Sequence, residues 1–190
     1  IGDGAGYGGA IFDDSRSGST VIGCEFFRNS ADVGGGFTSV GSSTDFPIVI
    51  DCTFVDNTAI LNGGGMYCEE VTAIVTNCTF FENKAGNGGA MFNSFFFAPT
   101  VTNCLFIGNS AVLGGAMYNW FGYGTFVNCT FNENTADSGG AIYSNFVSTP
   151  TVTNSILWGN SPDEVVDAGG ATMSVSYSTV KGGWSGAGSN

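Results

Sequence analysis

The sequence has no histidine and only four lysine and arginine residues. Without histidine the chain lacks the commonest general base and the commonest metal ligand of proteins. The four cations face 16 aspartates and glutamates, which gives a formal net charge of −12. A surface this acidic repels nucleic-acid phosphates and anionic lipid, so we expect no nucleic-acid partner. No apolar run approaches the roughly 20 residues of a membrane-spanning helix, so we expect no transmembrane segment.

The chain does have enough apolar material for one domain. Hydrophobic residues make up 43% of the 190 residues, which excludes disorder caused by low hydrophobicity despite 31 glycines. The chain begins at Ile1 with neither an initiator methionine nor a signal peptide, so we expect a mature or trimmed product.

A unit of about 26 residues repeats along the chain. Five cysteines recur at intervals of 28, 26, 26 and 25 residues, and a further 26 residues lead to Ser155. These cysteines are Cys24, Cys52, Cys78, Cys104 and Cys129. Two residues after each of the six positions stands Phe26, Phe54, Phe80, Phe106, Phe131 or Leu157. Five residues after each stands Asn29, Asn57, Asn83, Asn109, Asn134 or Asn160. A glycine pair completes the unit, opening at residues 8, 34, 63, 88, 114, 139 and 169.

This repeat predicts an all-β parallel β-helix. Helical repeats need a period of about 3.6 residues, whereas this unit has short runs of Val, Ile, Thr and Phe separated by Gly and Asn. Three short strands per unit would stack coil on coil about 4.8 Å apart, in a solenoid of roughly six to seven coils. We expect a single domain, with a partial coil at 1–23, five regular coils at 24–154 and an irregular terminal coil at 155–190.

The repeated side chains predict ladders along the solenoid axis. Cys78 and Phe80 lie two residues apart, so both point inward and stack on their copies in neighbouring coils. The repeated asparagine suits a turn in which its side-chain amide bonds the next asparagine. Glycine is needed where the chain turns tightly or crowds a neighbouring coil. A second polar ladder precedes the cysteines and is expected to mark a corner: Asp51, Asn77, Asn103, Asn128 and Asn154.

The repeat resembles that of the polymorphic outer membrane protein family. The strings FFRN, FVDN, FFEN, FIGN and FNEN match its FxxN half, and GGAI, GGAM, GGGF and GGGM match its GGA(I/L/V) half. The closing segment, from residue 154 onward, looks like the last coils of secreted bacterial β-helix proteins with such repeats. The resemblance implies a right-handed parallel β-helix, at a cell surface or outside the cell, that acts as an adhesin or passenger. It implies no catalytic mechanism.

The six cysteines allow two interpretations. A short extracellular chain with six cysteines suggests disulfides. However, five lie on the repeat period, and parallel side chains in adjacent coils hold their Cβ atoms wider than the ~3.8 Å of a disulfide. We therefore expect buried free thiols that pack as small apolar groups, with Cys68 off this ladder and unpaired. Metal binding lacks both histidine and CxxC spacing, so we expect neither a metal nor a cofactor.

Asp56 and Glu82 are the best carboxylate pair for catalysis. They stand four residues after successive cysteines, so they would lie about 5 Å apart, the separation found in retaining glycosidases. The alternative is a solvated turn whose repulsion is eased by Arg28 and Lys84, and we favour it.

Glycosylation sequons at Asn77 and Asn128 fall on the corner ladder and are interpreted as products of the repeat.

Aromatic and aliphatic residues also stand where they should face outward. If Phe80 points inward, the residue after it points outward, which predicts an apolar stripe along the rod: Phe27, Val55, Phe81, Ile107 and Trp158. The segments SFFF and NWFGY add Phe95, Phe96, Phe97, Trp120, Phe121 and Tyr123. These segments either fold back to cover the coil or offer a contact surface for a protein or a carbohydrate.

Together these features predict a non-catalytic extracellular or cell-surface solenoid with a structural or adhesive role. Neither end carries an amphipathic cap, so we expect the chain to be an excised segment or a subunit of a fibre or surface array. Self-association would be end to end or lateral, and a surface glycan or another protein is a further candidate partner. The alternative is a polysaccharide-binding or polysaccharide-cleaving β-helix protein, because fold alone does not decide function.

Overall fold

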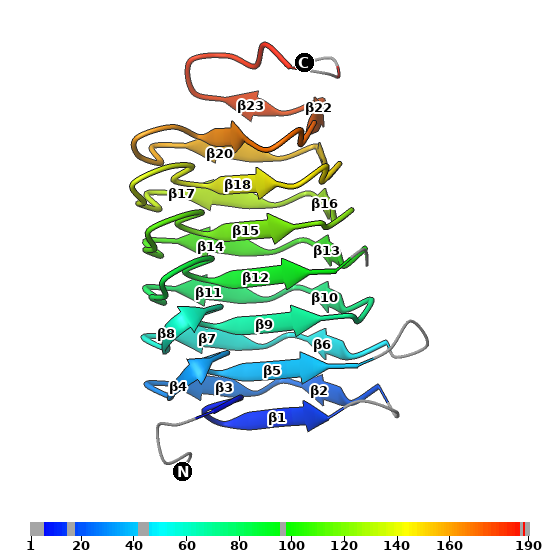
Figure 1. Ribbon diagram of the computed structural model, residues 1–190, viewed down its shortest axis with the longest axis vertical. Helices are drawn as coiled ribbons and strands as arrows, with labels where there is room; N and C mark the ends of the chain where they lie inside the picture. Colours follow the sequence, from blue (N-terminus) through cyan, green and yellow to red (C-terminus); the bar gives the residue numbers. More distant parts are fainter. Residues whose placement is uncertain (1–5, 15–17, 42–45, 96–97, 187, 189–190) are drawn as a thin grey trace.

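The computed structural model describes residues 6–14, 18–41, 46–95, 98–186 and 188, and these contain strands and turns but no helix. The strands wind into a rod of stacked coils about 26 residues apart (Figure 1). In Figure 1 the front strands run left to right and the chain returns behind them while it climbs, so the coil is right-handed. The predicted parallel β-helix is confirmed.

Each coil contributes one strand to each of three seven-stranded sheets, all paired in parallel. The first sheet contains β1 (Ile11–Asp14), β5 (Phe37–Val40), β9 (Met66–Glu69), β12 (Met91–Ser94), β15 (Met117–Trp120), β18 (Ile142–Asn145) and β21 (Val165–Asp167). The second contains β2 (Thr20–Ile22), β6 (Ile48–Ile50), β10 (Ile74–Thr76), β13 (Thr100–Thr102), β16 (Thr125–Val127), β19 (Thr151–Thr153) and β22 (Ser174–Ser176). The third contains β3 (Glu25–Phe27), β7 (Thr53–Val55), β11 (Thr79–Phe81), β14 (Leu105–Ile107), β17 (Thr130–Asn132), β20 (Ile156–Trp158) and β23 (Thr179–Val180).

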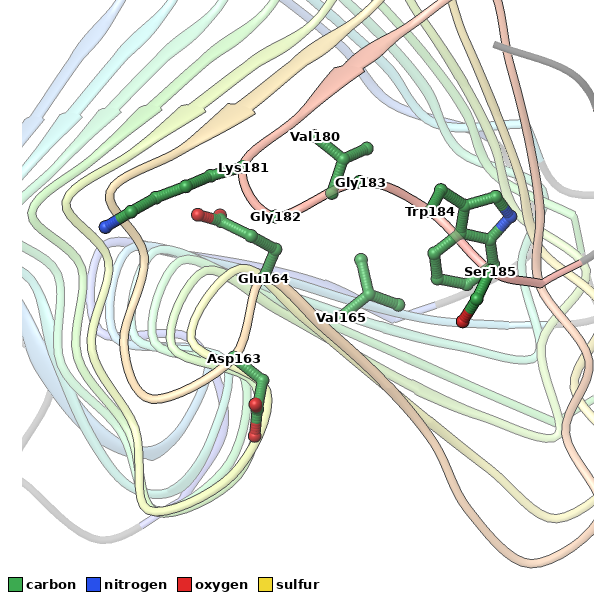
Figure 2. Close-up of a pocket in the computed structure, with 9 residues that line it drawn as sticks. All are labelled: Asp163, Glu164, Val165, Val180, Lys181, Gly182, Gly183, Trp184 and Ser185. Atoms are coloured by element: carbon green, nitrogen blue, oxygen red, sulfur yellow. The ribbon is translucent and has the colours of Figure 1, made fainter.

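Between the third sheet and the next strand of the first sheet, the chain forms a side lobe. The lobe contains the two-stranded sheet of β4 (Ser30–Val33) and β8 (Thr58–Asn62). In later coils single parallel bridges continue it, such as the bridge from Asn62 to Asn87 and the bridge from Asn87 to Leu113. Seen along the axis, the coils superpose into a triangle with this rounded lobe at one corner (Figure 2).

The interior is built from identical residues stacked on one another. The rings of Phe26, Phe54, Phe80, Phe106 and Phe131 stack with centroids 4.4–4.9 Å apart and planes within 3–5° of parallel. From Phe54 onward these rings are completely buried. Met66, Met91 and Met117 form a matching buried column in the first sheet. Parallel pairing in register therefore turns the sequence repeat into one continuous core.

The two glycines of each pair have different tasks. The first, such as Gly88 with φ +61°, adopts the left-handed conformation that turns the chain into the first sheet. The second, such as Gly89, has ordinary dihedrals, but a Cβ atom there would overlap the carbonyl oxygen of Gly115 in the next coil. The pair is thus required once for backbone conformation and once for close packing between coils.

The corner between the second and third sheets is formed by the second polar ladder. Asp51, Asn77, Asn103, Asn128 and Asn154 all have φ of 51–56°, a region that Asn and Asp tolerate better than other side chains. Their exposed amides bond along the axis, as when Asn77 Nδ2 donates to Asp51 Oδ1 at 3.1 Å.

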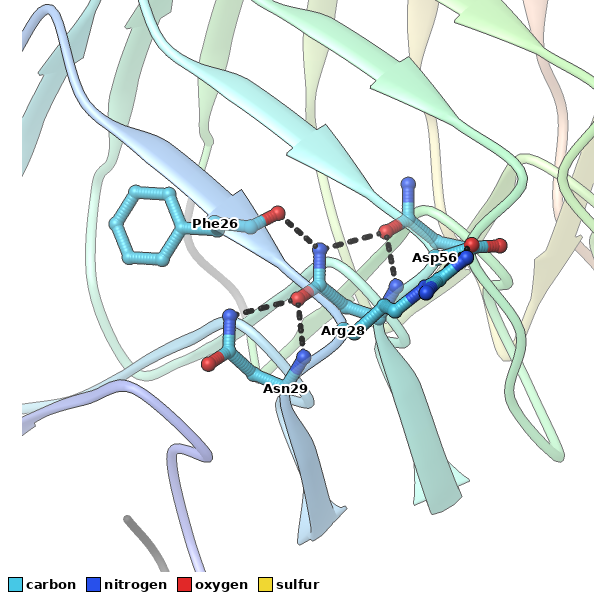
Figure 3. A network of polar contacts seen from close by, with 6 residues as sticks. Phe26, Arg28, Asn29 and Asp56 are labelled. Carbon is cyan, nitrogen blue, oxygen red and sulfur yellow. Dashed lines mark hydrogen bonds and ion pairs between the residues drawn. The ribbon is translucent and has the colours of Figure 1, made fainter.

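The repeated asparagine forms a buried ladder at the entrance to the lobe. Asn29 donates from its backbone N–H and from Nδ2 to Asn57 Oδ1, at 3.0 and 2.9 Å (Figure 3). The same pattern links Asn57 to Asn83, and each amide beyond Asn29 also donates to a carbonyl one coil back. The predicted asparagine ladder is confirmed. At its last step Asn160 Nδ2 donates to the buried carboxylate of Glu164, which takes the place of another asparagine.

The final coil is more regular than the sequence repeat suggested. Strands β21, β22 and β23 extend all three sheets beyond residue 155. Ser178 occupies the cysteine position, since its hydroxyl accepts the backbone N–H of Ser155, 23 residues earlier. A shortened period and the loss of the phenylalanine conceal this coil in the sequence.

Candidate functional site

The cysteines of the repeat lie at the inner side of the polar corner. Cys52, Cys78, Cys104 and Cys129 are buried, and all six cysteines of the chain are free thiols. Each buried thiol of the ladder donates to nearby carbonyl oxygens, as Cys78 does to Thr76 at 3.3 Å. Cys24 differs from the expectation of a buried ladder residue, because it lies at the end of the ladder and is exposed. Cys68 lies off the ladder but is buried in the first sheet, level with Asn93 in the next strand.

Thiol modification should separate Cys24 from the other five cysteines. Burial raises the pKa of Cys129 to about 11 and also raises the pKa of Cys52 and Cys68. Because the thiolate is the reactive form, these three groups become reactive only at pH values above the ordinary thiol range. Cys78 and Cys104 are buried as well, so a reagent in solution does not reach their sulfur atoms in the folded protein. We expect Ellman's reagent to modify one thiol in the folded protein at mildly alkaline pH, and six after unfolding without reductant. Two or fewer reactive thiols after unfolding would show that disulfides are present instead.

The candidate carboxylates lie on an exposed corner of the rod. Asp56 and Glu82 have φ of 55° and 54°, and they occupy the turn that leaves the third sheet. Asp56 Oδ2 pairs with Arg28 Nε at 3.2 Å across adjacent coils (Figure 3). The charge of Asp56 is therefore partly neutralised by a structural partner, and neither carboxylate lines any of the hollows described below. This arrangement fits a solvated turn better than a catalytic pair.

The outward apolar stripe runs along the third sheet. Phe27, Val55, Phe81 and Ile107 pair in register on successive strands, and Asn132 then separates them from Trp158. Phe27 is 50% exposed, Phe81 37% and Trp158 52%, whereas Val55 and Ile107 are half-buried. Two more exposed apolar residues, Leu105 and Ile156, face outward from the same strands. The stripe is thus a surface feature that spans most of the rod.

The loop aromatics lie at a different corner, after the first sheet. Trp120 is half-buried, with ring centroids 5.1 Å from Phe95 and 5.9 Å from Phe121. Tyr123 is 38% exposed. Phe96 and Phe97 lie outside the described residues. The two groups of aromatics that the sequence suggested as one contact surface therefore belong to two separate faces.

Sequence reasoning missed an aromatic column on the outer face of the first sheet. Tyr67, Phe92, Tyr118 and Tyr143 stack with centroids 5.0–5.3 Å apart. They are mostly buried, because lobe residues such as Leu113 pack against them. Burial raises the pKa of Tyr118, and burial followed by the nearby Glu69 raises that of Tyr67, so both phenols stay neutral. The signal was present in the sequence, since an aromatic follows GGxM or GGxI in four consecutive coils.

A groove lies where this column meets the lobe and the loop aromatics. Its volume is about 240 Å³, and its lining consists of Asn62, Asn87, Phe92, Tyr118, Trp120 and Phe146. A second hollow of about 340 Å³ lies on the lobe around Ile60, Leu61, Gly86 and Val112. A third, of about 210 Å³, lies at the C-terminal end of the rod, with Trp184 opposite Val165 and Glu164 (Figure 2).

The described residues offer no metal-binding cluster. They contain no group of three His, Cys, Asp or Glu residues placed to hold a metal ion. They also contain no helix long and apolar enough to span a membrane. What the surface does offer is the apolar stripe and the aromatic groove.

The fold and these surfaces define a repeat protein built as a parallel β-solenoid. Residues 128–145 match the family model of the Chlamydia polymorphic membrane protein repeat, so the resemblance read from the sequence is confirmed over these residues. No curated protein and no solved structure matches the chain. The fold and the matched repeat together support a repeat protein of the bacterial cell surface.

Proposed function

We propose that this chain is a non-catalytic structural or adhesive rod of the bacterial cell surface, and that the outer face of its third sheet makes lateral contacts between copies. The observation that carries the proposal is the apolar stripe, whose members keep one register along the rod axis. The matched polymorphic membrane protein repeat supports the surface location.

Straight rods are suited to lateral association through such a stripe. Parallel coils keep Phe27, Phe81 and Trp158 on one face, so two rods lying side by side would bury several apolar side chains together. Exposed apolar surface of this kind favours association, and an interface that covers it is stabilised by the hydrophobic effect. The net charge of −12 opposes indiscriminate bundling, since rods brought together by other faces repel one another.

Light scattering on the purified chain tests this proposal. We expect concentration-dependent growth in the mass of the wild-type particle, and its loss in Phe81→Asp, because burying an unpaired carboxylate in an apolar interface is strongly unfavourable. Raising the salt concentration should strengthen association of the wild type by screening the acidic surfaces.

Ile74→Asp is the matched control. Ile74 is 36% exposed, against 37% for Phe81, and it also stands on the outer face of a strand, but in the second sheet. The control variant should associate as the wild type does. A wild-type chain that stays monomeric at high concentration, or equal loss of association in both variants, would contradict the proposed contact.

A further inference from the structure

The groove beside the first sheet has the composition of a carbohydrate site. Phe92 and Tyr118 belong to the aromatic column, Trp120 and Phe146 come from the corner after the sheet, and Asn62 and Asn87 come from the lobe. Six residues on four successive coils thus meet around one hollow of about 240 Å³. Binding pockets typically combine an apolar lining with a few convergent polar groups, as this one does.

The lining contains no charged side chain, which defines the class of ligand. Four aromatic rings offer apolar contact, and the two primary amides offer both donors and acceptors. Asn87 Nδ2 donates to Asn62 Oδ1 at 3.0 Å, so Asn62 Nδ2 and Asn87 Oδ1 are the amide atoms that this bond does not use. A ligand that fits has one apolar face and hydroxyl groups at its edge, and it carries no charge.

A further polar group at the groove lacks a partner. Trp120 Nε1 is buried and makes no hydrogen bond within the described part of the chain. A buried donor without a partner is destabilising, and the cost is removed when a ligand acceptor reaches it. The indole that carries this N–H is half-buried and lines the groove.

We propose that this groove binds a neutral, extended β-linked glycan lying along the rod axis. Pyranose rings have an apolar face and equatorial hydroxyls, which match the aromatic rings and the asparagine amides. Phe92 and Tyr118, the two column residues that line the groove, have ring centroids 5.0 Å apart, close to the advance per ring of an extended β-linked sugar chain. An acidic polysaccharide is disfavoured, because the protein carries a net charge of −12 and its groove has no cation.

Isothermal titration calorimetry with cellohexaose tests this proposal, with maltohexaose and a galacturonic acid hexamer as comparisons. We expect saturable binding of cellohexaose and much weaker binding of the other two. Trp120→Ala and Phe146→Asn should each weaken cellohexaose binding about tenfold, as expected for loss of one aromatic contact. Phe146 is 44% exposed and has φ +52°, which asparagine tolerates, so this second variant should fold normally.

Trp158→Ala is the control, because Trp158 is an exposed tryptophan on the third sheet, away from the groove. It should leave glycan binding unchanged, and Trp120→Ala should leave lateral association unchanged. If the lateral association between rods were disproved, the glycan-binding measurement would therefore still stand. Absence of cellohexaose binding, unaltered binding in both groove variants, or preferential binding of maltohexaose or the acidic hexamer would overturn the proposal.

Discussion

Replacing Phe80 with alanine is expected to lower the free energy of unfolding by about 3–5 kcal/mol. The Phe80 ring is completely buried, with the ring of Phe54 at 4.6 Å on one side and that of Phe106 at 4.9 Å on the other. The parallel backbones on either side are fixed by their own hydrogen bonds, so the coils cannot collapse into the cavity. Loss of the ring therefore removes both its burial and its stacking contacts.

Urea unfolding monitored by circular dichroism measures this effect. Phe81→Ala is the matched control, since it removes the same side chain from the next position, where it is 37% exposed and points outward. The control should change stability by less than about 1 kcal/mol, as surface substitutions usually do. Equal losses in the two variants would show that Phe80 is not in the core.

Asn83→Ala is expected to be almost as damaging, at roughly 3–5 kcal/mol, because several buried groups lose partners at about 1–3 kcal/mol each. Asn83 Oδ1 accepts both the backbone N–H and Nδ2 of Asn57, at 3.1 and 2.9 Å. Its own Nδ2 donates to the carbonyl of Phe54 and to Asn109 Oδ1. Alanine thus leaves two donors and one carbonyl without their partners in a completely buried position.

Asn103→Ala is the matched control for the ladder. Asn103 also belongs to an asparagine ladder, where it donates to Asn77 and accepts from Asn128, but its side chain is exposed. Water replaces those bonds after substitution. Stability therefore falls mainly because alanine tolerates φ +55° less well than asparagine does. Chemical denaturation should rank Asn83→Ala well below Asn103→Ala in stability. The reverse order would contradict the role of the buried ladder.

The buried ladders were predictable because they depend on pairing in register. When Phe54, Phe80 and Phe106 recur at one period, a solenoid with that coil length places them on top of one another. The same argument covers the asparagines and the glycine pair, whose two tasks follow from chain reversal and from coil-to-coil spacing. Exposure of Cys24 was not predictable from the repeat, because burial at the end of a ladder depends on neighbouring coils that the motif does not specify.

The aromatic groove could not be predicted in this way. Alternation along a strand assigns Phe92 and Tyr118 to the outer face of the first sheet, where a repeat argument expects exposure. They are buried because the lobe, which lies outside the regular strand pattern, folds against that face. Similarly, nothing in the order of residues shows that Asn87 and Phe146 meet at one hollow, since they are 59 residues apart.

The sequence by itself therefore determined the solenoid, its coil length and the composition of its core, because these depend on a period that every coil repeats. Tertiary structure alone decided which outward-facing residues are covered by the lobe and which come together around the groove. Trp120 and Trp158 show the difference, because both face outward from β-strands, yet one is half-buried at a groove and the other is 52% exposed. The physical reason is that coil stacking is set by hydrogen bonds between like positions, whereas the outer surface is shaped by how the lobe and corners pack across the sheets.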